Sequence, residues 1–182
     1  MTTATTEKPQ RLRLDQAKID AASKSLDEGA VTPGYGPWRD DIVQLLNDAL
    51  ATELVCVLRY KRHYFTASGE ASPAIAEEFL VHANEESAHA DKIAERIVQL
   101  GGEPDFAPDT LTGRSHSEYK EGKDLVDMIR ENLVAERIAI DTYREIIRYL
   151  GDSDTTTRRI FEEILAVEEE HADDMADLLS GR

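Results

Sequence analysis

Two copies of one short motif, Glu-x-x-His, constrain how this chain of 182 residues can fold. They are Glu86 to His89 and Glu168 to His171. A Glu and a His three positions apart lie on the same face of a helix, about one turn from each other. In both places that face is the apolar stripe that should point into a protein core. Burying a carboxylate there without a partner is very costly, and a metal ion is the partner that suits this pair of side chains.

A lone glutamate precedes each motif at a matching distance, so the chain contains an internal repeat. Glu53 lies 33 positions before Glu86, and Glu136 lies 32 positions before Glu168. Both lone glutamates also fall on apolar stripes with steps of three and four residues. The chain therefore consists of two copies of helix–turn–helix, and each copy offers one lone Glu and one Glu-x-x-His.

The apolar periodicity predicts an all-α fold, because the alternating pattern of strands is missing. Four long helices are expected, over about residues 38–67, 72–100, 121–150 and 155–179. Ser72 is expected to cap the second helix, with Pro73 at its first position. The first two helices and the last two are joined by short turns, whereas residues 101–120 form a long connection. Short, long, short is the connectivity of a ferritin-like four-helix bundle with one crossover between helices two and three.

The N-terminal part has a different character and is predicted to be an extension, residues 1–37, ahead of a bundle over residues 38–182. Residues 1–14 are expected to be a disordered tail. A short helix is expected over residues 15–28, with Asp15 as its N-cap and Gly29 as its stop. Residues 33–37, Pro-Gly-Tyr-Gly-Pro, are expected to form a hinge.

Charge and cysteine content exclude several classes of function. The net charge of -16 disfavours nucleic acid and anionic lipid as partners and favours cations. The single cysteine, Cys56, excludes a disulfide framework or a cysteine-based metal site within one chain, and it indicates a reducing compartment. No stretch is apolar and long enough to span a membrane, and the polar N-terminus does not resemble a secretory signal. A cytoplasmic protein is expected.

Together the repeat places four carboxylates and two imidazoles on core-facing stripes. A Glu from each of two helices and a Glu-x-x-His from each of the other two form the di-iron carboxylate set. Carboxylates with one imidazole per metal suit iron or manganese, and the lack of thiolates argues against a structural zinc site. Four glutamates carry a charge of -4, which balances two divalent ions. The six predicted ligands are Glu53, Glu86, His89, Glu136, Glu168 and His171.

Other polar side chains on the same stripes are candidates for supporting roles. Tyr60 and Tyr143 each follow a lone glutamate by seven residues and are expected in the core. Tyr60 is also predicted to hydrogen-bond a ligand carboxylate and so to assist catalysis. His82 is expected beside the metals, as a supporting group or an accessory ligand, and Asn132 is a weaker supporting candidate. Structural roles are expected for His63, His116 and Cys56.

Residues 46–179 resemble the bacterioferritin and ferritin-like family. The resemblance rests on Leu46-Asn47 with Glu53 and Tyr60, on residues 86–91 with the Ile-Ala-Glu-Arg-Ile run at 93–97, and on the later glutamates and histidine. It implies a ferroxidase that oxidises Fe(II) with O2 or H2O2 and stores the ferric product in a hollow shell. It also implies two iron ions per subunit, with manganese or zinc as possible substitutes. One iron would be held by Glu53 and His89 and the other by Glu136 and His171, with Glu86 and Glu168 bridging both.

Two departures from the bacterioferritin pattern modify these expectations. Ser87 stands where bacterioferritins carry the methionine that ligates haem, so no haem is expected. The chain ends eleven residues after His171, so the short fifth helix of 24-subunit ferritins is not expected. The N-terminal extension and the Leu-Gly-Gly run at 100–102 instead resemble the twelve-subunit miniferritins of the Dps type. A homo-oligomeric cage of twelve subunits is therefore favoured, with 24 as the alternative.

Two other functions compete with iron storage. The first is a non-storage di-metal oxidase or peroxidase of the rubrerythrin kind, against which the missing Cys-x-x-Cys pairs count. The second is a DNA-protecting miniferritin that binds DNA through its N-terminal extension. Residues 1–39 carry six Lys or Arg and five Asp or Glu, a net charge near +1 (6 − 5). So small a charge gives little attraction to phosphates, and DNA binding is not expected.

Overall fold

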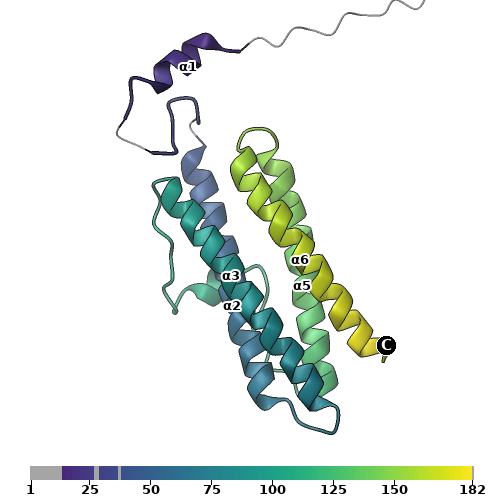
Figure 1. The fold of residues 1–182 in the computed structure, drawn as a ribbon. Helices are drawn as coiled ribbons and strands as arrows, with labels where there is room; N and C mark the ends of the chain where they lie inside the picture. Colours follow the sequence, from purple (N-terminus) through teal and green to yellow (C-terminus); the bar gives the residue numbers. More distant parts are fainter. Residues whose placement is uncertain (1–13, 27–28, 37, 182) are drawn as a thin grey trace, which may run out of the picture.

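The computed structural model describes residues 14–26, 29–36 and 38–181, and every element in this part of the chain is helical (Figure 1). The predicted disordered tail lies outside the described residues except for Leu14. Six helices are present: α1 (Gln16–Ala22), α2 (Arg39–Thr66), α3 (Ser72–Gln99), α4 (Leu111–Arg114), α5 (Leu125–Leu150) and α6 (Thr155–Ser180).

The four long helices form the predicted bundle with one crossover. Short turns join α2 to α3 and α5 to α6, and the members of each pair pack against each other along their length (Figure 1). The long connection from α3 to α5 carries α4, which packs on α2. The predicted fold class, an all-α ferritin-like four-helix bundle, is confirmed.

The long helices and the crossover differ from the predictions at three places. Helix α5 begins at Leu125 rather than at residue 121, because Asp124 is its N-cap and accepts from the backbone N–H of Asp127. Gly122, just before it, has a φ of +66°, a conformation that suits glycine and stops a helix from extending backwards. Ala71, not Ser72, occupies the N-cap position of α3. The four-residue helix α4 was not predicted.

The N-terminal segment is hydrogen-bonded to the bundle through Tyr35, shortly before α2 begins. Asp15 caps α1 as predicted, accepting from the backbone N–H of Lys18, but the helix ends at Ala22 rather than near residue 28. No side chain of α1 is buried, and the helix lies beyond the end of the bundle (Figure 1). Further along, the Tyr35 hydroxyl donates to Asp154 at 2.5 Å. The domain boundary at residue 37 stays a prediction.

Two apolar clusters fill the bundle, one toward each end. The larger contains Leu46, Ile93, Tyr143 and Phe161 among others. The smaller is built from Tyr60, Phe79, Ala83, Met128, Ile129 and Met175. On each of the four long helices, the predicted metal ligands lie between residues of one cluster and residues of the other. The apolar clusters therefore hold a polar layer between them, closed off from water. Among the described helices, none is both long and apolar enough to cross a membrane.

Candidate metal centre

The polar layer brings together all six side chains that the repeat singled out. Each is at most 4% exposed to solvent. Their ligand atoms form two groups, and within each group all atoms lie within 4.8 Å of one another. One group is Glu53, Glu86, His89 and Glu168, and the other is Glu86, Glu136, Glu168 and His171. Glu86 and Glu168 belong to both groups, which is the arrangement that two metals with bridging carboxylates need.

Both imidazoles present Nδ1 to the carboxylates. Nδ1 of His89 lies 3.0 Å from Oε1 of Glu168 and 3.3 Å from Oε2 of Glu53. Nδ1 of His171 lies 3.6 Å from Oε1 of Glu86 and 3.7 Å from Oε2 of Glu168. The two rings are stacked with centroids 6.3 Å apart. The Nδ1 atoms of both histidines thus face one shared set of oxygens.

Polar atoms without hydrogen-bond partners concentrate in this layer. Ten buried side-chain nitrogen or oxygen atoms of the described residues have no partner, and seven of them belong to the six clustered side chains. Leaving so many buried acceptors unpaired costs free energy at each atom. A pair of cations would use these atoms at once, so the side chains present fit a di-metal site.

The protonation states of the metal-free centre follow from burial and mutual repulsion. Burial raises the pKa of both Glu53 and Glu136 well above the usual range, and the charges of Glu86 and Glu168 add to the effect. Burial alone would lower the pKa of the two histidines. The surrounding carboxylates instead raise the pKa of His89 to about 12 and that of His171 to about 11. Without metal, protons provide the positive charge that the clustered carboxylates require.

Two tyrosines support the lone glutamates by crossing between the two halves of the bundle. The Tyr60 hydroxyl of α2 donates to Oε1 of Glu136 on α5 at 2.5 Å. The Tyr143 hydroxyl of α5 donates to Oε1 of Glu53 on α2. The predicted hydrogen bond of Tyr60 to a clustered carboxylate is therefore present. Tyr143, expected to be only a core residue, makes the symmetric bond.

Comparison with known proteins agrees with this geometry. The family model described as a ferritin-like domain matches residues 43–181, which contain all four long helices except the first turn of α2.

The chain belongs to the ferritin-like family.

Its relatives fall into the groups that the ligand pattern suggests. A bacterioferritin from Brucella melitensis is 31% identical over 135 residues, which cover 72% of this chain and 78% of that relative. A solved structure of the bacterioferritin-related protein from Bacteroides fragilis, described as a dodecameric thioferritin, has a TM-score of 0.76. It is 30% identical, and the match covers 91% of this chain and 94% of that one. The bacterioferritin of Rhodobacter capsulatus, solved with a metal-free dinuclear site and haem iron, has a TM-score of 0.69 at 27% identity, covering 78% of this chain and 84% of that one.

In this ferritin-like chain, Glu85 is a site residue that the sequence analysis missed. Its Oε2 lies 2.9 Å from Nε2 of His171. A carboxylate on one imidazole nitrogen fixes the tautomer and leaves the other nitrogen with its lone pair free. Glu85 thereby directs Nδ1 of His171 toward the clustered oxygens. Its place next to Glu86 gave no signal, since neighbours on a helix point in different directions.

Arg59 places a buried positive charge near the cluster, where it interacts electrostatically with Glu136. Its side chain has no exposed surface. Nε donates to Oδ1 of Asn132 at 3.0 Å, and Nη2 lies 3.2 Å from Sγ of Cys56. Asn132 also bonds His63, at 3.1 Å. Asn132, the weaker supporting candidate, thus directs its carbonyl oxygen to Arg59 and His63.

The remaining predicted structural residues have local partners. His63 is buried, and its Nε2 lies 3.1 Å from the backbone oxygen of Lys120. His116 pairs with the hydroxyl of Thr52 at 2.9 Å and so fastens the crossover to α2. Their hydrogen bonds agree with the structural roles expected for them.

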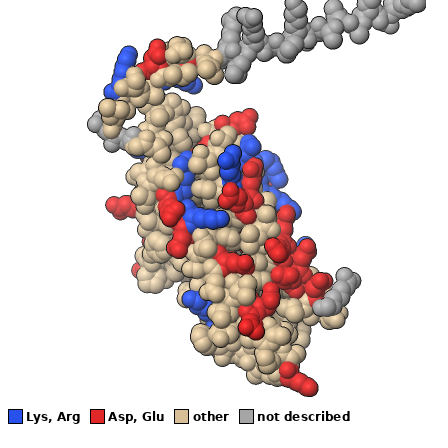
Figure 2. All heavy atoms as spheres, in the orientation of Figure 1, with Lys and Arg blue, Asp and Glu red and all other residues tan. Residues whose placement is uncertain are grey.

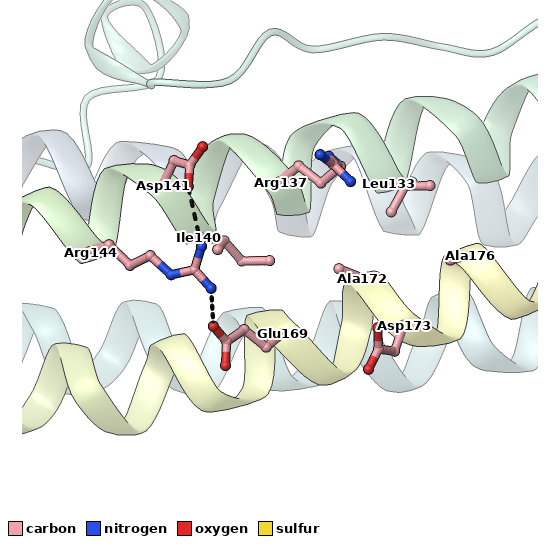
Figure 3. A pocket seen from close by; sticks show the side chains of 9 residues that line it. All are labelled: Leu133, Arg137, Ile140, Asp141, Arg144, Glu169, Ala172, Asp173 and Ala176. Atoms are coloured by element: carbon pink, nitrogen blue, oxygen red, sulfur yellow. Dashed lines mark hydrogen bonds and ion pairs between the residues drawn. The ribbon is translucent and has the colours of Figure 1, made fainter.

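A groove of about 450 Å³ runs along the outer surface between α5 and α6 (Figure 3). Arg144 spans it, with one nitrogen 3.4 Å from Asp141 and another 2.5 Å from Glu169. Asp173 lies at the α6 side of the same groove. None of the six clustered side chains lines this groove. The groove is therefore a feature of the outer surface, separate from the six clustered side chains.

Proposed function

We propose that this chain is a ferroxidase subunit that oxidises Fe(II) and stores the ferric product inside a homo-oligomeric cage. The observation that carries the proposal is the pair of buried ligand groups that share Glu86 and Glu168. Their mixture of oxygens with one imidazole per metal suits iron. The similarity to bacterioferritins over most of the chain supports the same function.

Each residue of the centre has a defined part in this proposal. Glu53 and His89 would hold one iron and Glu136 and His171 the other, with Glu86 and Glu168 shared by both. Tyr60 and Tyr143 fix the outer carboxylates through the crossing hydrogen bonds. The buried layer keeps bulk water away from both positions. No haem belongs to the proposal, because Ser87 replaces the methionine that bacterioferritins use.

The reaction balances as a two-electron oxidation. Two Fe(II) ions at the paired positions give two electrons, which with two protons reduce O2 to H2O2 or reduce H2O2 to two waters. The four carboxylates neutralise the two divalent ions. Storage requires that the ferric product then leave the centre for a mineral core inside the cage.

A cage of twelve subunits is the assembly we propose, with 24 as the alternative. The dodecameric relative from Bacteroides fragilis supports it, since the match covers nearly all of both chains. Light scattering on the purified protein should give a mass of about twelve subunits of 20.3 kDa. After aerobic addition of Fe(II), the particle should retain many more iron ions than two per subunit. A monomer or dimer, or peroxide turnover without retained iron, would instead indicate a non-storage di-metal enzyme.

Metal loading of the centre should release protons. His89 and His171, with pKa values of about 12 and 11, hold protons at neutral pH without metal, and the pKa values of Glu53 and Glu136 are raised as well. Metal ligands must be deprotonated, so binding two Co(II) ions should release at least about two protons per subunit. Affinity should rise with pH, by at least about 10-fold per metal ion for each pH unit. Anaerobic titration in a pH-stat measures both quantities, and release of fewer than about two protons would contradict these protonation states.

A further inference from the structure

A second cluster of possible ligands lies beside the centre, on α3 and α6. His82 is 1% exposed, and its Nε2 lies 3.4 Å from Oε1 of Glu78 and 3.4 Å from Oδ2 of Asp174. The three ligand atoms are within 4.8 Å of one another. The carboxylates are about half exposed and open onto a surface hollow of about 330 Å³, which Asp177 also lines. One buried imidazole thus points outward at two carboxylates that solvent ions can reach.

The distances in this cluster fit a cation between the three atoms better than direct hydrogen bonds. A charged imidazolium would bond a carboxylate at about 2.7–2.9 Å, clearly shorter than the 3.4 Å found twice here. Ligands at about 2.1 Å from a tetrahedral metal ion lie about 3.4 Å from each other. The separation of Nε2 from both oxygens equals the edge of such a tetrahedron.

The hydrogen bonds on the other side of His82 leave Nε2 with a free lone pair. The Tyr60 hydroxyl donates its only proton to Glu136. Nδ1 of His82 lies 3.2 Å from the same hydroxyl oxygen, so it is the donor of that contact when Glu136 is ionised as a metal ligand. In the neutral imidazole the proton is then on Nδ1, and Nε2 is an acceptor that faces two further acceptors. A cation is the group that satisfies all three.

We propose that Glu78, His82 and Asp174 form a separate binding site for a third divalent cation of the kind that accepts mixed nitrogen and oxygen ligands in tetrahedral coordination, such as Zn(II), Co(II) or Fe(II). None of these three side chains belongs to the two ligand groups of the centre. The site connects to the centre through the chain of hydrogen bonds from His82 to Tyr60 and Glu136. The His82 ring also stacks on the His171 ring, with centroids 3.9 Å apart.

The surroundings favour cations at this place. Acidic side chains predominate over the C-terminal half of α6 on the face that Figure 2 shows. A surface of one sign raises the local concentration of ions of the opposite sign. The third site therefore lies on a part of the surface where the local concentration of divalent cations is raised.

Anaerobic titration with Co(II), in excess Mg²⁺ to occupy sites made only of oxygens, tests this proposal. The full-length wild type should bind about three Co(II) per subunit, and Glu78→Gln with Asp174→Asn should bind about two. In Co(II)-soaked crystals, an anomalous peak should lie within bonding distance of Nε2 of His82. Asp173→Asn is the matched control: it removes the same charge one residue away, on the side of α6 that lines the groove in Figure 3. It should still bind about three.

The outcomes separate this site from the di-metal centre. Glu86→Ala with Glu168→Ala should remove the two ions of the centre and leave the peak at His82. An absent peak at His82 in the wild type, or equal binding by wild type and the Glu78→Gln and Asp174→Asn variant, would overturn the third site. A peak at His82 with no metal between Glu86 and Glu168 would overturn the proposed function and leave this inference standing.

Discussion

Replacing Glu168 with alanine is expected to abolish rapid oxidation of Fe(II) while the helices stay folded. Glu168 is 1% exposed, and both its oxygens are among the atoms without partners. It belongs to both ligand groups, so its loss removes a ligand from each metal and the bridge between them. Since changes in residues that merely support a ligand cost about 10–100-fold, loss of a bridging ligand should cost about 100-fold or more. Stopped-flow absorbance after mixing the anaerobic Fe(II)-loaded protein with O2 or H2O2 measures the rate.

Glu169→Ala provides the matched control for this variant. Glu169 is the next residue of α6, and its carboxylate is on the surface, where it pairs with Arg144 across the groove (Figure 3). The same change there should leave the rate within about twofold of wild type, because exposed ion pairs contribute little. Circular dichroism should show equal helix content in both variants. If Glu168→Ala oxidised Fe(II) as fast as Glu169→Ala, the assignment of the centre would be wrong.

The same pair of variants also distinguishes a lost metal site from a damaged fold. A ligand that binds only the folded protein raises its stability by an amount that grows with its concentration. Co(II) should therefore raise the melting temperature of wild type and of Glu169→Ala under anaerobic conditions. The melting temperature of Glu168→Ala should respond much less. A variant that merely packed badly would melt earlier and still gain stability from the metal.

The fold could be predicted because the four long helices carry their own signals. Apolar stripes placed the ends of α2, α3 and α6 within one residue. The start of α5 was missed because the capping signal, Asp124 with Asp127 three positions later, lay inside a segment already taken as helix. Helix α4 has only four residues, including Gly113, and so offers no periodicity to detect.

The clustering of the six side chains could be predicted because the repeat places them at equal depth, but which carboxylate each tyrosine bonds could not. Tyr60 follows Glu53 by seven residues on one helix, yet it bonds Glu136 on another. Tyr143 reaches back to Glu53 in the same way. Such pairs depend on how the two halves of the bundle face each other, and spacing along a single helix does not contain that information. Arg59 was missed for a similar reason, since its buried partners come from α5 as well as from its own helix.

Replacing Asp154 with alanine is expected to give the largest loss of stability outside the centre. Asp154 is 4% exposed and joins three parts of the chain. Both its oxygens accept from Nη2 of Arg96 on α3 at 3.0 Å, and one accepts from the Tyr35 hydroxyl. It also caps α6, accepting from the backbone N–H of Thr157 at 2.9 Å. Removing the carboxylate leaves the charge of Arg96 buried without its partner, which costs about 3–5 kcal/mol.

Urea unfolding of the metal-free protein, at one fixed protein concentration, measures this loss in the free energy of unfolding. Asp152→Ala is the control, since that carboxylate is fully exposed and the change should have no measurable effect. Arg96→Met combined with Asp154→Ala should recover part of the loss, because an apolar side chain leaves no unpaired charge. If the double variant were no more stable than Asp154→Ala alone, the loss would come from the missing helix cap and not from the unpaired charge of Arg96.

The effect of Asp154→Ala should also depend on pH, in a direction that its hydrogen bonds determine. Burial by itself would raise the pKa of this carboxyl, but the donors Thr157, Tyr35 and Arg96 hold it below its ordinary value. A carboxyl with a lowered pKa in the folded state contributes stability above its unfolded pKa, near about 3.9. That contribution is lost as the pH falls through the lower, folded value. The stability difference between wild type and Asp154→Ala should thus be constant from neutral to weakly acidic pH and shrink in strong acid. A difference that grew on acidification would contradict an ionised Asp154 paired with Arg96.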